Sequence, residues 1–142
     1  MLAPMPDAAA TKLIQDAMPL CEKLGIRAES SRPDEVVLSL DWAADLCTTF
    51  GLLHGGVVMA LADSAGATCA VLNLPEGASG TSTIESKTNF LRGVKEGTVT
   101  ATSTPLHAGR STIVVETTVH NNDRLVAKVT QTHTVLRNAP GR

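Results

Sequence analysis

The segment GGVVMALADSAGATCAVL, residues 55–72, decides the fold of this chain. It is apolar on nearly all sides and rich in alanine, a composition typical of a helix that is buried against several neighbours. Pro75, Gly77 and Gly80 follow it and end the helical pattern. The segment therefore predicts a long central helix, and the rest of the chain must supply the surface that covers it.

In much of the remaining chain, apolar residues recur at every second position, which is the period of a half-buried strand. Before the helix, the alternation over residues 36–42 predicts a strand, with residues 26–31 as its hairpin partner. After the helix, turn residues separate four more strand-like runs, at residues 81–91, 98–105, 111–120 and 124–136. We expect these four strands to form a meander in which each strand pairs with the next.

The chain opens with a helical pattern over residues 8–24, where apolar residues recur every three or four positions. Pro19 is expected to kink or split this helix, and Gly25 to end it. Residues 1–7 and 138–142 are expected to be loose tails. Because no repeat or linker interrupts the sequence, we expect a single α+β domain over residues 1–142, with an antiparallel sheet wrapped around one long central helix.

The composition excludes several classes of protein. The 142 residues are 43% apolar and 18% charged, with a net charge of −2, so a folded globular chain is expected rather than a disordered one. Three aromatic residues and no basic run argue against nucleic-acid binding. Three widely spaced cysteines match neither a disulfide framework nor a zinc site, so no metal or cofactor is expected. Without a signal peptide or a membrane-length apolar run, we expect a cytoplasmic protein with no membrane partner.

The sequence His54-Gly55-Gly56 stands at the start of the predicted central helix. A helix N-terminus presents unpaired N–H groups, and glycine lets a ligand oxygen approach the backbone closely. These are the elements of an oxyanion hole. An ordinary junction between a loop and a helix would explain the same glycines.

Asp63 lies in the middle of the predicted helix among alanine and leucine residues. A carboxylate in such surroundings is costly unless it is paired or used in a reaction, so Asp63 is a candidate catalytic group. The alternative is that this helix face meets solvent, or that a backbone or threonine partner satisfies the acid. Ser64 lacks the motif of a serine nucleophile, Cys69 is flanked by apolar residues, and the histidines at 107, 120 and 133 are expected to be at the surface or hydrogen-bonded.

Taken together, His-Gly-Gly followed by this acid resembles the hotdog-fold acyl-CoA thioesterases, specifically their PaaI-like (phenylacetate-pathway) branch. The stretch LLHGGVVMALADSAGATCA is similar to the helix signature of that family, and TIESKTNFLRG to the strand that follows. The runs GTVTATSTPLHAGRS and DRLVAKVTQTHTVL are similar to the remaining strands. The resemblance covers residues 50–136 and implies a hotdog fold.

The resemblance also implies roles for individual residues. Asp63 takes the place of the carboxylate that acts as nucleophile or general base, and the Gly55 N–H takes the place of the donor to the thioester carbonyl. His54 matches a residue that shapes the site, and Thr83 a hydroxyl that orients water. The sequence departs from the family at Thr48, where many relatives carry Asn or Gln. Residues that match positions near the coenzyme A substrate are Gly56, Asn89, Arg92 and Arg110.

The sequence therefore favours the hypothesis that this protein is an enzyme that hydrolyses acyl-CoA. The alternative hypothesis is a non-catalytic hotdog domain that binds acyl-CoA or an acyl carrier. A third hypothesis is a hotdog dehydratase or hydratase, which the spacing between the histidine and the acid matches less well. Because Gly55 and Asp63 are eight residues apart on one helix, about 12 Å along its axis, the two must come from different chains to meet at one thioester. We therefore expect a homodimer, and the family implies that dimers pair into tetramers.

Overall fold

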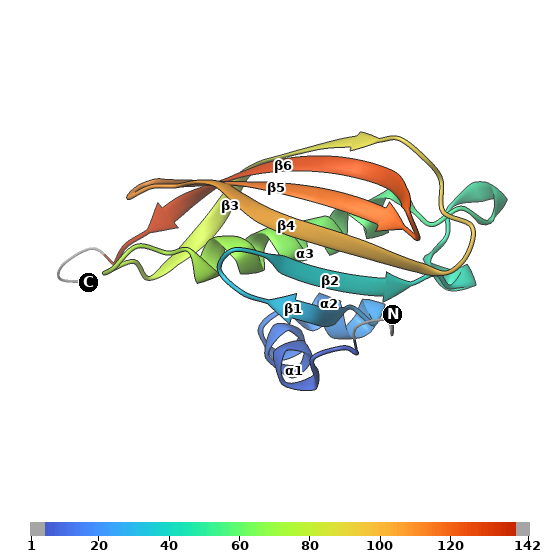
Figure 1. Ribbon diagram of the computed structural model, residues 1–142, viewed down its shortest axis with the longest axis horizontal. Coiled ribbons are helices and arrows are strands. Elements are labelled where there is room, and N and C mark those ends of the chain that lie inside the picture. The colour runs from blue at the N-terminus through green and yellow to red at the C-terminus, as the bar shows by residue number, and fades with distance from the viewer. Residues whose placement is uncertain (1–4, 139–142) are drawn as a thin grey trace.

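A computed structural model describes residues 5–138. One antiparallel sheet of six strands wraps around a single long helix, α3, which spans Gly55–Leu72 (Figure 1). The strands are β1 (Arg27–Ser31), β2 (Val36–Asp41), β3 (Gly80–Phe90), β4 (Thr98–Ala108), β5 (Thr112–Asn121) and β6 (Arg124–Leu136). This is the predicted α+β architecture and the arrangement expected of a hotdog fold.

The helix α3 begins and ends at the predicted residues. Its side chains that are buried beneath the sheet include Leu61, Ala62, Ala65 and Cys69, which are fully inaccessible to solvent. The helix has 18 residues and a mean hydropathy of 1.5, so by length and composition alone it could cross a membrane, contrary to the sequence expectation. The position of α3 against the sheet explains its apolar composition without a membrane, because its apolar side chains are buried there away from water.

The strand order differs from the predicted meander. It is β1-β2-β4-β5-β6-β3, so β3 does not pair with its sequence neighbour β4. Only β4, β5 and β6 form the meander, while β3 lies at the edge and pairs with β6 through Ser86 opposite Gln131. The expectation of four consecutive paired strands was wrong because alternation identifies a strand and its faces but carries no information about its neighbours.

The N-terminal helix is split at the predicted proline. The first part, α1 (Ala8–Ala17), and the second, α2 (Pro19–Leu24), meet at Met18, and Pro19 is the first residue of α2. Gly25 ends α2 with a positive φ of 72°, a conformation that glycine adopts without steric cost. Both helices lie on the β1 side of the molecule (Figure 1).

The two predicted tails are described only in part. Asp7 caps α1 by accepting a hydrogen bond from the Ala10 N–H at 2.9 Å, and its own N–H donates to the Ala28 carbonyl at 2.8 Å. The last residue of the segment before α1 is therefore hydrogen-bonded both to the helix and to strand β1. Residues 1–4 and 139–142 lie outside the described part of the chain.

The segment between β2 and α3 holds two short 3₁₀ turns, Ala44–Leu46 and Thr49–Gly51. It is anchored to the start of α3, because the His54 N–H donates to the Leu46 carbonyl and the Leu53 N–H donates to the Val94 carbonyl. These bonds hold the end of the segment and the residues before β4 close to the first turn of α3. The candidate site lies at that junction.

Candidate active site

His54 caps α3 with its own side chain. Its Nδ1 accepts a hydrogen bond from the Gly56 N–H at 2.8 Å, and its carbonyl accepts from the N–H groups of Val57 and Val58. The neutral ring that accepts at Nδ1 carries its proton on Nε2. Among residues 5–138, the N–H of Gly55 has no hydrogen-bond partner. The first turn of α3 therefore presents one free backbone donor, the N–H of Gly55.

The side chain of His54 also explains why residue 56 is a glycine. A Cβ at Gly56 would lie 2.9 Å from the His54 Nδ1, too close for the ring to fold back onto the helix. The N–H of Gly56, which the sequence placed among the substrate-binding groups, is already bonded to this ring. Gly56 thus shapes the cap that leaves Gly55 free.

A pocket of about 340 Å³ opens at this end of α3. Gly55, Thr48 and Arg92 all contribute to its lining, together with the ring of Phe90. The Arg92 guanidinium donates to the Leu125 carbonyl at 2.9 Å, which leaves further N–H groups for an anion. The fold therefore brings together three residues that the sequence singled out separately, and exposed Asn89 lies next to Phe90 on β3.

Asp63 lies in the middle of α3 on the exposed side of the helix. Its Oδ1 accepts a hydrogen bond of 2.7 Å from the Nε2 of Gln131, a fully buried side chain on β6. From the sequence, solvent, a backbone group or a threonine was the alternative to a catalytic role for this acid, but its observed partner is Gln131. The alternation on β6 places Gln131 on the inner face of the sheet. Because a buried amide needs a hydrogen-bond partner, its position in the sequence could have indicated that it binds another polar group.

Thr83, on β3, is hydrogen-bonded to a second buried polar residue of β6. Its Oγ1 lies 3.2 Å from the Nδ1 of His133, which is fully buried. Burial lowers the pKa of His133, and the charge of Asp63 opposes part of that effect. His133 is therefore hydrogen-bonded, as expected, but only at Nδ1, because its Nε2 has no partner within residues 5–138.

Two buried residues of α3, Cys69 and Ser64, carry side chains that can act as nucleophiles, but neither is a candidate for the catalytic group. Burial raises the pKa of the Cys69 thiol to about 11, so the thiolate is scarce at neutral pH. The Ser64 hydroxyl donates to the Ala60 carbonyl at 2.7 Å, within its own helix. Cys69 is part of the hydrophobic core, as its apolar neighbours in the sequence indicated, and Ser64 is a buried polar residue.

Within one chain, Gly55 and Asp63 remain apart. They are eight residues from each other on the same helix, a separation of about 12 Å along the axis. Asp63 does not contribute to the pocket beside Gly55. Arg110 is also remote, because it follows the far end of β4, whose 11 residues extend roughly 35 Å from the region of Gly55.

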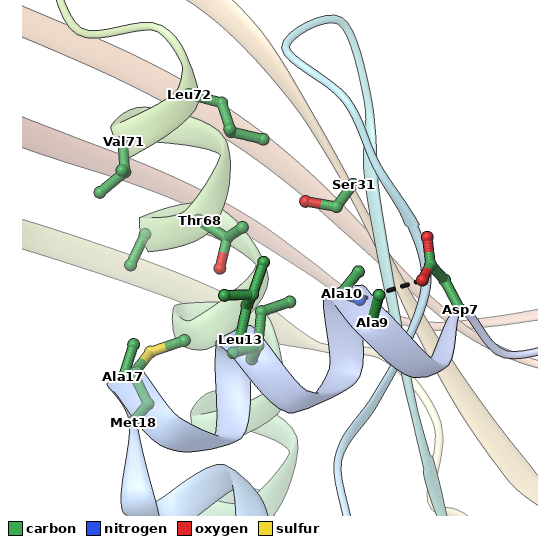
Figure 2. A pocket seen from close by; sticks show the side chains of 12 residues that line it. Asp7, Ala9, Ala10, Leu13, Ala17, Met18, Ser31, Thr68, Val71 and Leu72 are labelled. Carbon is green, nitrogen blue, oxygen red and sulfur yellow. Dashed lines mark hydrogen bonds between the residues drawn. The ribbon is translucent and has the colours of Figure 1, made fainter.

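A larger, apolar groove of about 570 Å³ lies between α1 and the second half of α3. Figure 2 shows Leu13, Ala17 and Met18 on one side of it and Thr68, Val71 and Leu72 on the other. Ala67, one helical turn after Asp63, also lines it. The groove therefore begins next to the face of α3 that carries the carboxylate.

Comparison with known proteins places these features in a family. Residues 50–128 match the Thioesterase superfamily. ComA2 of Bacillus subtilis, a proposed esterase, is 33% identical over 75% of this chain and 86% of its own length. The 1,4-dihydroxy-2-naphthoyl-CoA hydrolase of Listeria monocytogenes is 34% identical over 70% of this chain and 80% of its own.

The fold agrees with these sequence matches. The crystal structure of the thioesterase HI1161 from Haemophilus influenzae superimposes with a TM-score of 0.82 at 28% identity, over 96% of each chain. The residues that match the family, 50–128, contain the capped start of α3, Asp63 and the strands β3, β4 and β5. This chain therefore belongs to the thioesterase superfamily.

Proposed function

We propose that this protein is an acyl-CoA thioesterase of the PaaI-like branch, in which Asp63 is the catalytic carboxylate and the Gly55 N–H binds the thioester oxygen. The observation that carries the proposal is the free Gly55 N–H at the start of α3, beside a pocket that also holds Arg92. A helix N-terminus with one unsatisfied donor favours the negative charge that develops on a carbonyl oxygen during attack. A relative at 34% identity is named as a hydrolase of a CoA thioester.

The chemistry needs one carboxylate and one donor, because a thioester is already activated. As a general base, Asp63 takes a proton from water while the water oxygen bonds to the thioester carbon. The Gly55 N–H stabilises the resulting oxyanion, which collapses as the carbon–sulfur bond breaks and the thiolate of CoA leaves with a proton. As a nucleophile, Asp63 would instead form a mixed anhydride that water then hydrolyses. Both routes give a free carboxylate and CoA.

The apolar groove beside α3 is the proposed site for the acyl chain. It begins one turn from Asp63, and its volume of about 570 Å³ falls within the usual range for small-molecule sites. Arg92 is the proposed contact for the phosphates of CoA, because it lines the pocket beside Gly55. Arg110 can serve the same substrate only if another chain brings it to the site.

We propose that the active site is completed by a second copy of the chain. The 12 Å separation of Gly55 and Asp63 is too long for both to reach one thioester carbon, and two antiparallel copies of α3 would place the start of one helix near the middle of the other. The edge strand β3 supports this proposal. Most of its 11 residues are exposed, including Ile84 at 66% and Phe90 at 52%, and a long exposed edge is a surface for pairing.

The test is a panel of acyl-CoA thioesters of different acyl groups, with free thiol release as the measurement. The wild-type protein should hydrolyse at least one member of the panel. Asp63→Ala and Asp63→Asn should each lower kcat by at least ~10²-fold while the folded state is retained. A wild-type protein that binds acyl-CoA without releasing thiol would instead support a binding domain, and near-normal kcat in either variant would remove Asp63 from the mechanism.

A further inference from the structure

The hydrogen bond between Gln131 and Asp63 joins two residues that are 68 positions apart in sequence. Gln131 is fully buried, and its backbone is held between Ser86 of β3 and Val115 of β5. A carboxylate can only accept hydrogen bonds, so the amide must present its Nε2 to Asp63. The donor therefore comes from a rigid element, while the carboxylate that it binds is on an exposed helix face.

This arrangement has two local costs. With its Nε2 facing Asp63, the amide leaves its Oε1 buried without a hydrogen-bond partner in residues 5–138. The same oxygen lies against Gly66, where the Cβ of any other residue would overlap with it. Gly66 is in the interior of α3, where glycine stabilises a helix less than alanine does. A leucine at 131 with alanine at 66 would avoid both costs.

We infer that Gln131 is a positioning residue that holds the Asp63 carboxylate in one orientation, and that Gly66 is a glycine in order to admit it. This inference rests on the proposed function of Asp63. With its Oδ1 held by the amide, the carboxylate directs its other oxygen at the substrate or at water. Because a reacting group must be held within a fraction of an ångström, loss of this bond lowers the rate while substrate binding changes little.

The first experiment compares Gln131→Met with a matched change elsewhere in the sheet. Methionine has a similar length but no N–H group. We expect kcat to fall by ~10- to 100-fold with KM within about threefold, because the interaction acts on the reacting carboxylate. The control is the double variant Ser103→Ala/Thr117→Val, which removes a buried 2.6 Å hydroxyl pair from β4 and β5 and should leave kcat within about twofold. Equal kcat in Gln131→Met and wild type would overturn the inference while leaving the thioesterase function intact.

The second experiment tests the role of Gly66 through stability. Gly66→Ala should lower the melting temperature and kcat, because its methyl group displaces the amide of Gln131. In a Gln131→Ala background the overlap is gone, so the same Gly66→Ala change should no longer lower the melting temperature, while kcat stays low. If Gly66→Ala lowers the melting temperature equally in both backgrounds, the amide is not the reason for the glycine.

The third experiment does not depend on turnover. The side-chain amide signal of Gln131 in a nitrogen–proton NMR spectrum should shift in Asp63→Ala and stay in place in the Ser103→Ala/Thr117→Val control. An unchanged signal in Asp63→Ala would overturn the inference. If the wild-type protein hydrolyses no thioester, the proposed function fails, and this spectrum still decides whether Gln131 holds Asp63.

Discussion

The Nδ1 of His54 accepts the Gly56 N–H at 2.8 Å, and this bond decides which backbone donor of α3 is available to a ligand. By binding the second N–H of the helix, the ring leaves the N–H of Gly55 as the free donor of the first turn. The described role of the His54 side chain is therefore that of a helix cap.

The cap can be tested by two substitutions at His54. His54→Ala removes the acceptor and should lower the free energy of unfolding by about 0.5–2 kcal/mol, with a loss of kcat because the start of α3 frays. His54→Asn keeps an oxygen acceptor and should stay within a few tenths of a kcal/mol of wild type. Denaturant unfolding followed by circular dichroism measures both. Equal destabilisation by the two variants would show that the ring contributes something other than the cap.

The proposed two-chain site predicts complementation between inactive variants. Asp63→Ala and Gly55→Leu should each be inactive alone; the second change places a bulky side chain against Phe90, whose Cζ lies 3.3 Å from the position of a Cβ at Gly55. After unfolding and refolding together, heterodimers have one intact site in two, so the mixture should regain up to about a quarter of wild-type activity. Refolding each variant alone is the control. An active monomer in analytical ultracentrifugation would contradict the prediction.

Arg92 and Arg110 should differ in their effects on substrate affinity. Arg92→Ala should raise KM for acyl-CoA by about three- to tenfold with little change in kcat, and should have less effect on a short thioester that lacks the nucleotide. Arg110→Ala should raise KM only if assembly brings this residue to the pocket of another chain. Arg32→Ala is the matched control, because Arg32 pairs with Asp34 at 3.1 Å in the turn between β1 and β2. A KM for Arg92→Ala equal to that of wild type would remove Arg92 from the site.

His133 should make stability depend on pH. Burial lowers its pKa in the folded protein, so the unfolded chain binds the proton more tightly. The stability that this residue contributes is therefore fully present above its ordinary pKa of about 6.5 and is lost as the pH falls from there through the folded-state pKa. In denaturant titrations between pH 7.5 and 5.5, His133→Gln should lose less stability than wild type. An equal loss in the two proteins would contradict this.

The groove between α1 and α3 should set the preference for acyl chain length. Ala67→Phe fills the groove one turn beyond Asp63 and should lower kcat/KM for a decanoyl thioester by at least ~10-fold more than for a butyryl one. Leu20→Phe, on α2 and outside the groove, is the control of similar bulk and should not change the ratio. A ratio that is unaffected by Ala67→Phe would place the acyl chain elsewhere.

Local patterns in the sequence were sufficient to predict the elements that carry the site. The apolar, alanine-rich run predicted α3 with its observed ends, and the proline and glycine at 19 and 25 predicted the split and the end of the first helix. The period-two pattern predicted the buried face of β5, including Ile113 and Val119. Each of these features depends on residues within a few positions of one another, because a helix or a strand repeats over that distance.

The sequence by itself determined the central helix, the alternating faces of β4 and β5, and the places of Gly55 at the start and Asp63 in the middle of that helix. Only the tertiary structure decided that β3 pairs with β6, that Gln131 meets Asp63 across 68 residues, and that Arg92 shares a pocket with Gly55 whereas Arg110 does not. The physical reason is that the alternation of a strand is the same whichever strand lies beside it. The choice of neighbour, and with it every contact between distant side chains, follows from how the sheet as a whole closes around α3.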